Sequence, residues 1–140
     1  MEKDDAVELA TAATGNRPER VAWFMDQGLG LFVHWSLDSQ LGSVISHSMV
    51  GASADYLRRY IHDLPRTFLP TRFDADEWAR LAKVAGVRYV VFTTKHHNGF
   101  CMFETATTDF QVKNTPYGQD VVRQVVDAFR HWEIGIGFYL

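Results

Sequence analysis

Short apolar runs alternate with amphipathic stretches along most of this chain, and two of the runs end abruptly in histidine. Residues 29–33 read Leu-Gly-Leu-Phe-Val and lead directly into His34. Further runs lie within residues 88–94 and 134–140. Apolar runs of this length, without polar alternation, are typical of strands that are buried on both faces. The pattern therefore predicts three buried strands.

Helical spacing of apolar residues fills the segments between these strands. The clearest signals belong to a helix that begins at Asp74, because Asp74 and Glu77 have the spacing of a capping box and Gly86 stands where a helix commonly ends. A further helix is predicted over residues 120–132. Its buried face is expected to consist of four apolar residues at helical intervals, namely Val122, Val125, Val126 and Phe129.

Two earlier helices are also expected. The first opens at Asn16, which is a good capping residue, with Pro18 in its first turn, and it ends at Gly28. The second is capped by Ser53 and closed by Pro65. Long loops are predicted between residues 38 and 51 and between residues 96 and 118.

From residue 29 onward, the predicted order is strand, helix, strand, helix, strand. Helices between consecutive buried strands imply right-handed crossovers and a parallel sheet, so the fold class is α/β. Residues 1–15 show no such pattern and are predicted to form a flexible N-terminal arm, which leaves residues 16–140 as one folded unit. Because the third strand comes last and is apolar, we expect it to pair with further polypeptide, with a partner chain or with a second copy.

Composition narrows the classes of partner. The chain is 46% hydrophobic and 22% charged, as in ordinary globular proteins, and its formal net charge of −3 offers no basic footprint for nucleic acid. No apolar run has the length of a membrane-spanning helix, and the acidic start lacks the apolar segment of a signal peptide. The single cysteine, Cys101, excludes an internal disulfide. We therefore expect no nucleic-acid or membrane partner and a cytoplasmic location.

The candidate chemistry is concentrated in histidines at the ends of two predicted strands. His34 ends the first, and His96 and His97 follow the second. Because the carboxyl ends of parallel strands meet at one edge of a sheet, the histidines are expected to share one pocket. On an extended backbone His96 and His97 would point in opposite directions. Either they are structural residues with satisfied nitrogens, or they recognise polar ligands.

The residues around the histidines favour hydroxyl recognition over metal binding. No carboxylate or cysteine lies beside them at the spacing of metal ligands, so neither a metal nor another cofactor is predicted. Neutral imidazole both donates and accepts hydrogen bonds, which suits hydroxyl groups. Three carboxylates lie near strand ends: Asp38, Glu104 and Asp109. None of them directly follows a buried strand, so no acid/base pair is predicted. Trp35 is interpreted as a core residue.

Several of these segments resemble the N-terminal part of the α-L-fucosidases of glycoside hydrolase family 29. The resemblance extends from about residue 17 to the end of the chain, and its most specific parts are the strand-histidine motifs. The matching stretches are residues 23–35, 73–86, 89–101, 108–116 and 137–139.

The resemblance implies a fold and a site. The fold would be roughly the first three βα units of a (β/α)₈ barrel. His34, His96 and His97 would contact fucose hydroxyls, and Tyr139 would line the same pocket. The family's usual Glu-Trp pair after the first strand is absent here, and His47 within residues 46–49 is a candidate substitute.

The resemblance also implies a retaining mechanism that uses an aspartate nucleophile and a separate acid/base carboxylate. The nucleophile would lie on the fourth strand, beyond Leu140. The sequence therefore predicts an N-terminal fragment of an α-L-fucosidase that supplies the part of the site that binds a fucoside or fucosylated glycan, without catalytic residues of its own. The alternative is a non-catalytic sugar-binding or assembly module that works with a partner chain.

Overall fold

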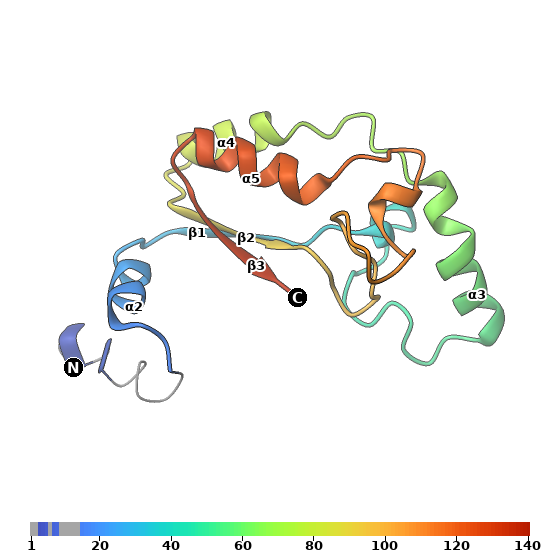
Figure 1. The fold of residues 1–140 in the computed structure, drawn as a ribbon, viewed down its shortest axis with the longest axis horizontal. Helices are drawn as coiled ribbons and strands as arrows, with labels where there is room; N and C mark the ends of the chain where they lie inside the picture. The colour runs from blue at the N-terminus through green and yellow to red at the C-terminus, as the bar shows by residue number, and fades with distance from the viewer. Residues whose placement is uncertain (1–2, 6, 9–14) are drawn as a thin grey trace.

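A three-stranded parallel sheet lies at the centre of the computed structural model, which describes residues 3–5, 7–8 and 15–140 (Figure 1). Its strands are β1 (Gly30–Val33), β2 (Tyr89–Thr93) and β3 (Gly135–Tyr139), and they are arranged in the order β1-β2-β3. Both pairings are parallel, so the predicted parallel sheet of an α/β fold is confirmed. Each strand is shorter than predicted, by one residue at one end or both.

The remaining elements connect and flank this sheet. Helix α4 (Ala75–Val84) precedes β2, and helix α5 (Val121–His131) precedes β3. Before them along the chain lie α2 (Pro18–Met25) and α3 (Ala54–His62). Short 3₁₀ segments complete the order: η1 (Leu37–Gln40), η2 (Leu64–Thr67) and η3 (Val112–Asn114). None of the helices in the described part of the chain is both long and apolar enough to cross a membrane.

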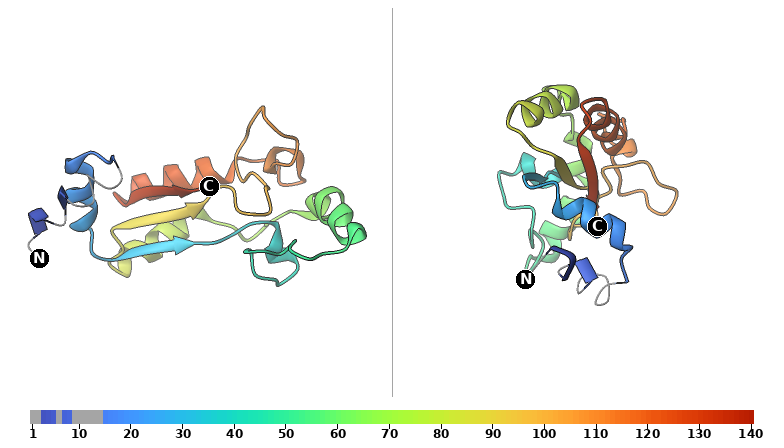
Figure 2. Two further views of the ribbon diagram at one scale, coloured as in Figure 1. Left: turned by 90° about the horizontal axis from the view of Figure 1, so that it is seen from below. Right: turned by 90° about the vertical axis from the view of Figure 1, so that its left-hand side faces the viewer.

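Helices α4 and α5 cover the same face of the sheet, as Figures 1 and 2 show. Val90 and Phe92 of β2 point toward the helices and are fully buried. Register places Leu31 of β1 and Ile136 of β3 beside Val90, so all three strands contribute to the same core. Burial of these side chains between sheet and helices supplies the main stabilisation of the fold.

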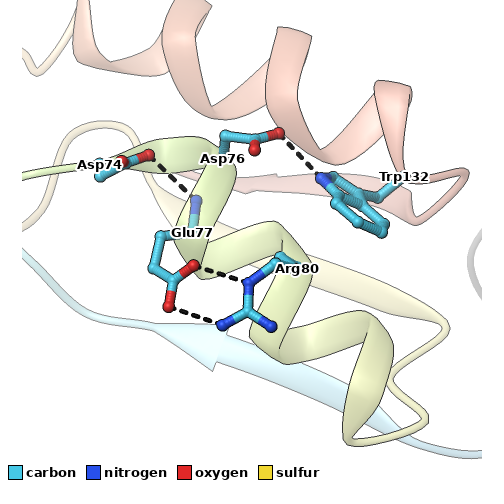
Figure 3. A network of polar contacts seen from close by, with 5 residues as sticks. All are labelled: Asp74, Asp76, Glu77, Arg80 and Trp132. Atoms are coloured by element: carbon cyan, nitrogen blue, oxygen red, sulfur yellow. Dashed lines mark hydrogen bonds and ion pairs between the residues drawn. The ribbon is translucent and has the colours of Figure 1, made fainter.

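Polar contacts fix α4 and its neighbour α5, as Figure 3 shows. The Asp74 carboxylate accepts a hydrogen bond from the Glu77 N–H at 3.0 Å, which confirms the predicted N-cap. The Glu77 carboxylate binds Arg80 in a bidentate pair at 2.7 and 2.8 Å. Trp132, just after α5, donates its indole N–H to Asp76 at 2.8 Å and so ties the two helices together.

Helix α5 is rotated relative to the prediction. Its most buried residues are Val121, Val125 and Phe129, whereas Val122 and Val126 are only half-buried. The Met102 carbonyl accepts hydrogen bonds from the first N–H groups of the helix, at 3.1 Å from Val121. The loop before α5 therefore covers the first turn, and the buried stripe includes Val121.

The two predicted N-caps before β2 that belong to α2 and α3 have different outcomes. Ser53 caps α3 as predicted, accepting from the Tyr56 N–H at 3.2 Å. Helix α2 begins with Arg17 at the N-cap rather than Asn16, and no side-chain bond caps it. The predicted arm, residues 1–15, lies largely outside the described residues. In its described part, residues 3–5 and 7–8 are helical, and Lys3 forms an ion pair with Asp26.

Candidate functional site

The carboxyl ends of β1 and β2 are joined by the hydroxyl of Thr93. Thr93 Oγ1 accepts a hydrogen bond from the Trp35 N–H at 3.1 Å and lies 3.3 Å from the carbonyl oxygens of Val33 and Trp35. The Trp35 ring packs against the core ring of Phe73, with centroids 4.8 Å apart, in agreement with its interpretation as a core residue. Because Trp35 is fixed in this way, His34 before it is held at the edge of the sheet.

A second tie joins β2 to β3 at the same edge. The N–H of Thr94 and its hydroxyl both donate to the Tyr139 carbonyl, each at 3.0 Å. The Tyr139 ring is thereby held beside the segment that follows β2. The two ties bring the ends of all three strands into one polar region.

The structure gathers all five predicted binding residues in one cluster of ring contacts, which we call the histidine cluster: His34, His47, His96, His97 and Tyr139. His96 lies at its centre. The His96 ring centroid is 5.2 Å from that of His34, 4.5 Å from that of His97 and 5.1 Å from that of Tyr139. His47 stacks on His97 at 5.1 Å.

The expectation that His96 and His97 point in opposite directions is wrong. Strand β2 ends at Thr93, and a turn closed by the Gly99 N–H on the His96 carbonyl at 2.8 Å follows it. The two residues therefore stand on a turn, where the alternation of a strand no longer applies, and both rings belong to the cluster.

His96 is nearly buried, whereas His34 and His97 are exposed. Burial lowers the pKa of His96, and the nearby imidazoles of His97 and His34 lower it further, against the smaller raising effects of the Ile45 backbone and the charge of Asp38. Its imidazole is therefore neutral near pH 7. Its Nδ1 atom is buried and makes no direct hydrogen bond among the described residues.

A cavity of about 430 Å³ opens beside His34. Its lining also includes Asp38 and four serines: Ser36, Ser39, Ser43 and Ser46. Hydroxyl and imidazole groups can each donate and accept, so this surface suits a polyhydroxylated ligand. Within the described residues, no group of three or more potential metal ligands is placed to hold an ion.

Residues that the sequence reasoning did not assign to the site lie around the histidine cluster. Phe32 is half-exposed, and its ring lies 4.3 Å from that of His34 and 5.7 Å from that of Tyr139. Asp38 and Asn98 are buried side by side, joined by a hydrogen bond of 2.7 Å. The apolar run 29–33 is the signal that could have identified Phe32, since alternate residues of a strand share a face.

Comparisons with known proteins identify the family of this chain. The family model of α-L-fucosidase matches residues 2–140. The chain belongs to the α-L-fucosidase family, glycoside hydrolase family 29. Among its relatives, a putative α-L-fucosidase 1 of Oryza sativa subsp. japonica is 34% identical over 128 residues, and the match covers 86% of this chain and 21% of the relative. The tissue α-L-fucosidase of Homo sapiens is 30% identical over 132 residues, and the match covers 84% of this chain and 28% of that protein.

Solved structures of the family share the fold. A family 29 α-L-fucosidase from Bacteroides thetaiotaomicron, trapped as a covalent intermediate with 2-fluoro-fucosyl fluoride, superposes with a TM-score of 0.75 at 34% identity. The match covers 89% of this chain and 30% of that one. The chain thus spans less than a third of the length of these relatives. Its three parallel strands fit part of the TIM-barrel catalytic domain of the family.

Proposed function

We propose that the histidine cluster binds the hydroxyl groups of a terminal α-L-fucosyl residue, and that these residues serve retaining hydrolysis of α-L-fucosides in a complete barrel. The observation that carries this proposal is the meeting of His34, His96 and Tyr139 at the carboxyl ends of β1, β2 and β3. That edge is where barrels of parallel strands place their active sites. The covalent intermediate of the Bacteroides thetaiotaomicron relative supports retention, since a retaining enzyme forms a glycosyl-enzyme bond.

Each group in the cluster would have a definite role. Neutral His96 would offer a ring nitrogen to a sugar hydroxyl, either as donor or as acceptor according to its tautomer. His34 and Tyr139 border it from two other strands and would fix the orientation of the ring. His47 would extend the contact through His97, in place of the family's Glu-Trp pair.

In this proposal the catalytic carboxylates come from outside this chain. Asp38 is the carboxylate whose charge acts on His96, and both its oxygens accept hydrogen bonds, from Tyr60 at 2.8 Å and from Asn98 at 2.7 Å. A carboxylate held in this way is not free to attack an anomeric carbon. The chain by itself would therefore bind the sugar without cleaving it.

A non-catalytic role as a sugar-binding or assembly module is the second candidate. The outer edges of β1 and β3 carry no strand partner in the described part of the chain, and Leu140 is 79% exposed. A partner chain could complete the sheet at these edges. A cytoplasmic location likewise stays a prediction, based on the single cysteine.

Hydrolysis of 4-nitrophenyl α-L-fucopyranoside tests the proposal. It is measured on the complete barrel that the proposal assumes, here called the encoded protein, and on this chain alone. The encoded protein is expected to release nitrophenol and, by NMR, first the α-anomer of fucose. The chain alone is expected to release none above the buffer rate, while L-fucose, but not its mirror image D-fucose, shifts its histidine resonances. Turnover by the chain alone that one of its own carboxylate variants abolishes would contradict the proposed division of roles.

Two single histidine variants provide a test with a matched control. His34→Ala should abolish the fucose-induced shifts, whereas His62→Ala, an exposed histidine in the last turn of α3, should leave them intact. Equal loss in both variants, or loss of binding on treatment with a chelator, would exclude direct hydroxyl recognition.

A further inference from the structure

The loop after β1 and the turn after β2 are held together by one buried polar network. Its members are Ser36, Asp38, Tyr60 and Asn98, and each is at most 5% exposed. They come from four places in the chain: the end of the β1 loop, η1, α3 and the turn that carries the histidine pair. Buried polar groups are costly unless hydrogen-bonded, so a network of this kind has one preferred arrangement.

Asp38 is the acceptor on which the network converges. The Tyr60 hydroxyl donates to Asp38 Oδ1 at 2.8 Å, and Asn98 Nδ2 donates to Asp38 Oδ2 at 2.7 Å. Burial, together with the hydrogen bond to Asp38, raises the pKa of the Tyr60 phenol, so it keeps its proton and remains a donor.

Asn98 carries this constraint into the histidine turn. Its Nδ2 also lies 2.8 Å from the Tyr60 hydroxyl and 3.0 Å from Ser36 Oγ. Its Oδ1 accepts from the Phe100 N–H at 2.9 Å, which fixes the amide's orientation. His96 and His97 directly precede Asn98, so the position of this amide sets where the turn lies relative to His34.

We propose that Asp38 is a positioning residue of the sugar site, which holds the turn bearing His96 and His97 against the loop that follows His34. That the positioned turn serves a sugar site rests on the proposed function. The hydrogen bonds that hold the turn do not depend on that function. A displacement of the turn by about 1 Å would separate the stacked rings of His96 and Tyr139, and misplacements of that size cost up to about a hundredfold in rate or binding.

A purely structural role would have a different signature. Loss of a structural contact would lower the melting temperature and leave the folded site unchanged well below that temperature. Loss of a positioning contact would alter the site in the folded state. The groups that face His96 are the rings of His34, His97 and Tyr139 and the charge of Asp38, so its resonances report directly on this region.

The test uses Asp38→Asn, which keeps the shape and removes the charge, in the protein as encoded. The first readout is the nuclear Overhauser contact between the rings of His96 and Tyr139. The second is the dissociation constant for L-fucose, both measured well below the melting temperature. We expect the ring contact to weaken and fucose binding to weaken about ten- to a hundredfold. Tyr60→Phe, which removes one donor to Asp38, should act in the same direction and less strongly.

Two further variants make the result decisive. The exchange Asp38→Asn with Asn98→Asp rebuilds a carboxylate-amide pair in reverse and should restore both readouts. Asp55→Asn is the matched control, because Asp55 also binds side chains, Arg58 and Arg59, but on the exposed face of α3. It should change neither readout.

The outcomes separate the two proposals. Asp38→Asn and Tyr60→Phe proteins that melt at lower temperature, yet keep the ring contact and the wild-type affinity for fucose, would overturn the positioning role. If the wild-type protein binds no fucose at all, the proposed function fails. The ring contact then still decides whether Asp38 positions the turn.

Discussion

The ring of His96 lies almost parallel to the ring of Tyr139, with centroids 5.1 Å apart and planes inclined by 23°. His96 follows β2, and Tyr139 ends β3, so the contact exists only because the two strands are parallel neighbours in register. The Thr94 N–H and hydroxyl, which both bind the Tyr139 carbonyl, hold the pair in place. Phe32 and His34 of the β1 side complete the surface around it.

In a complete barrel that contains this chain, His34→Ala should lower kcat/KM for an aryl α-L-fucoside by about ten- to a thousandfold, or ~1.4–4 kcal/mol of transition-state binding. His34 is exposed at the end of β1 and touches the cluster through its ring, so the melting temperature should change little. Steady-state kinetics and thermal melting measure the two effects. A variant that unfolds instead would identify His34 as a structural residue.

The pH dependence of stability should contain a contribution from His96. The pKa of His96 is lowered in the folded protein, mainly by burial. At pH values between this folded-state pKa and the ordinary pKa near 6.5, the unfolded chain therefore binds more protons than the folded chain. The contribution is therefore fully present above about pH 6.5 and is lost as the pH falls through the folded pKa. Urea unfolding at a series of pH values should show this decline, and His96→Gln should reduce its slope; an unchanged slope would contradict it.

The two aspartate caps of α4 and α5 should differ in their cost of removal. Asp74 accepts from the Glu77 N–H, so Asp74→Ala should lower the free energy of unfolding by about 1 kcal/mol. Asp120 accepts from the Arg123 N–H at 2.8 Å and also from the Glu104 N–H at 3.0 Å, which ties the preceding loop to the helix. Asp120→Ala should therefore cost about 2 kcal/mol. Urea denaturation measures both, and equal costs would mean that the bond to Glu104 adds nothing.

Gly30→Ala should destabilise the fold by about 1–3 kcal/mol, because overpacking forces neighbouring groups to shift. A Cβ at this position would lie 2.1 Å from Cζ of the Tyr89 ring, on the face of the sheet away from α4 and α5. The double variant with Tyr89→Ala should recover part of the loss, since the obstructing ring is gone. Additive losses in the double variant would show that the contact with Tyr89 is not the cause.

Self-association of the isolated chain is expected from the outer edges of β1 and β3, which lack strand partners in the described residues. Phe138 is 55% exposed and Leu140 is 79% exposed, which adds apolar surface beside the β3 edge. Size-exclusion chromatography with light scattering should show dimers or larger species, and Phe138→Glu should shift them toward monomer. A wild-type chain that stays monomeric at high micromolar concentration would disprove this expectation.

The sequence by itself determined the strands, most of the helix caps and the identity of the histidine cluster. Apolar runs and capping residues act within a few residues of themselves, so Ser53 and Asp74 were readable as caps from their neighbours alone. His34 and His96 were predictable because parallel strands must bring their carboxyl ends to one edge, whereas Tyr139 was implied by the resemblance to family 29.

Tertiary structure alone decided which polar residues would be buried beneath that edge. Asp38 stands in a Ser-rich loop, where sequence pattern gives no sign of burial, and Asn98 reads as an ordinary Asn-Gly turn. They meet because η1, α3 and the turn after β2 fold onto one another, and long-range contacts of this kind leave no local period in the chain. The same holds for His96 and His97, which share a cluster because a turn, rather than an extended strand, carries them.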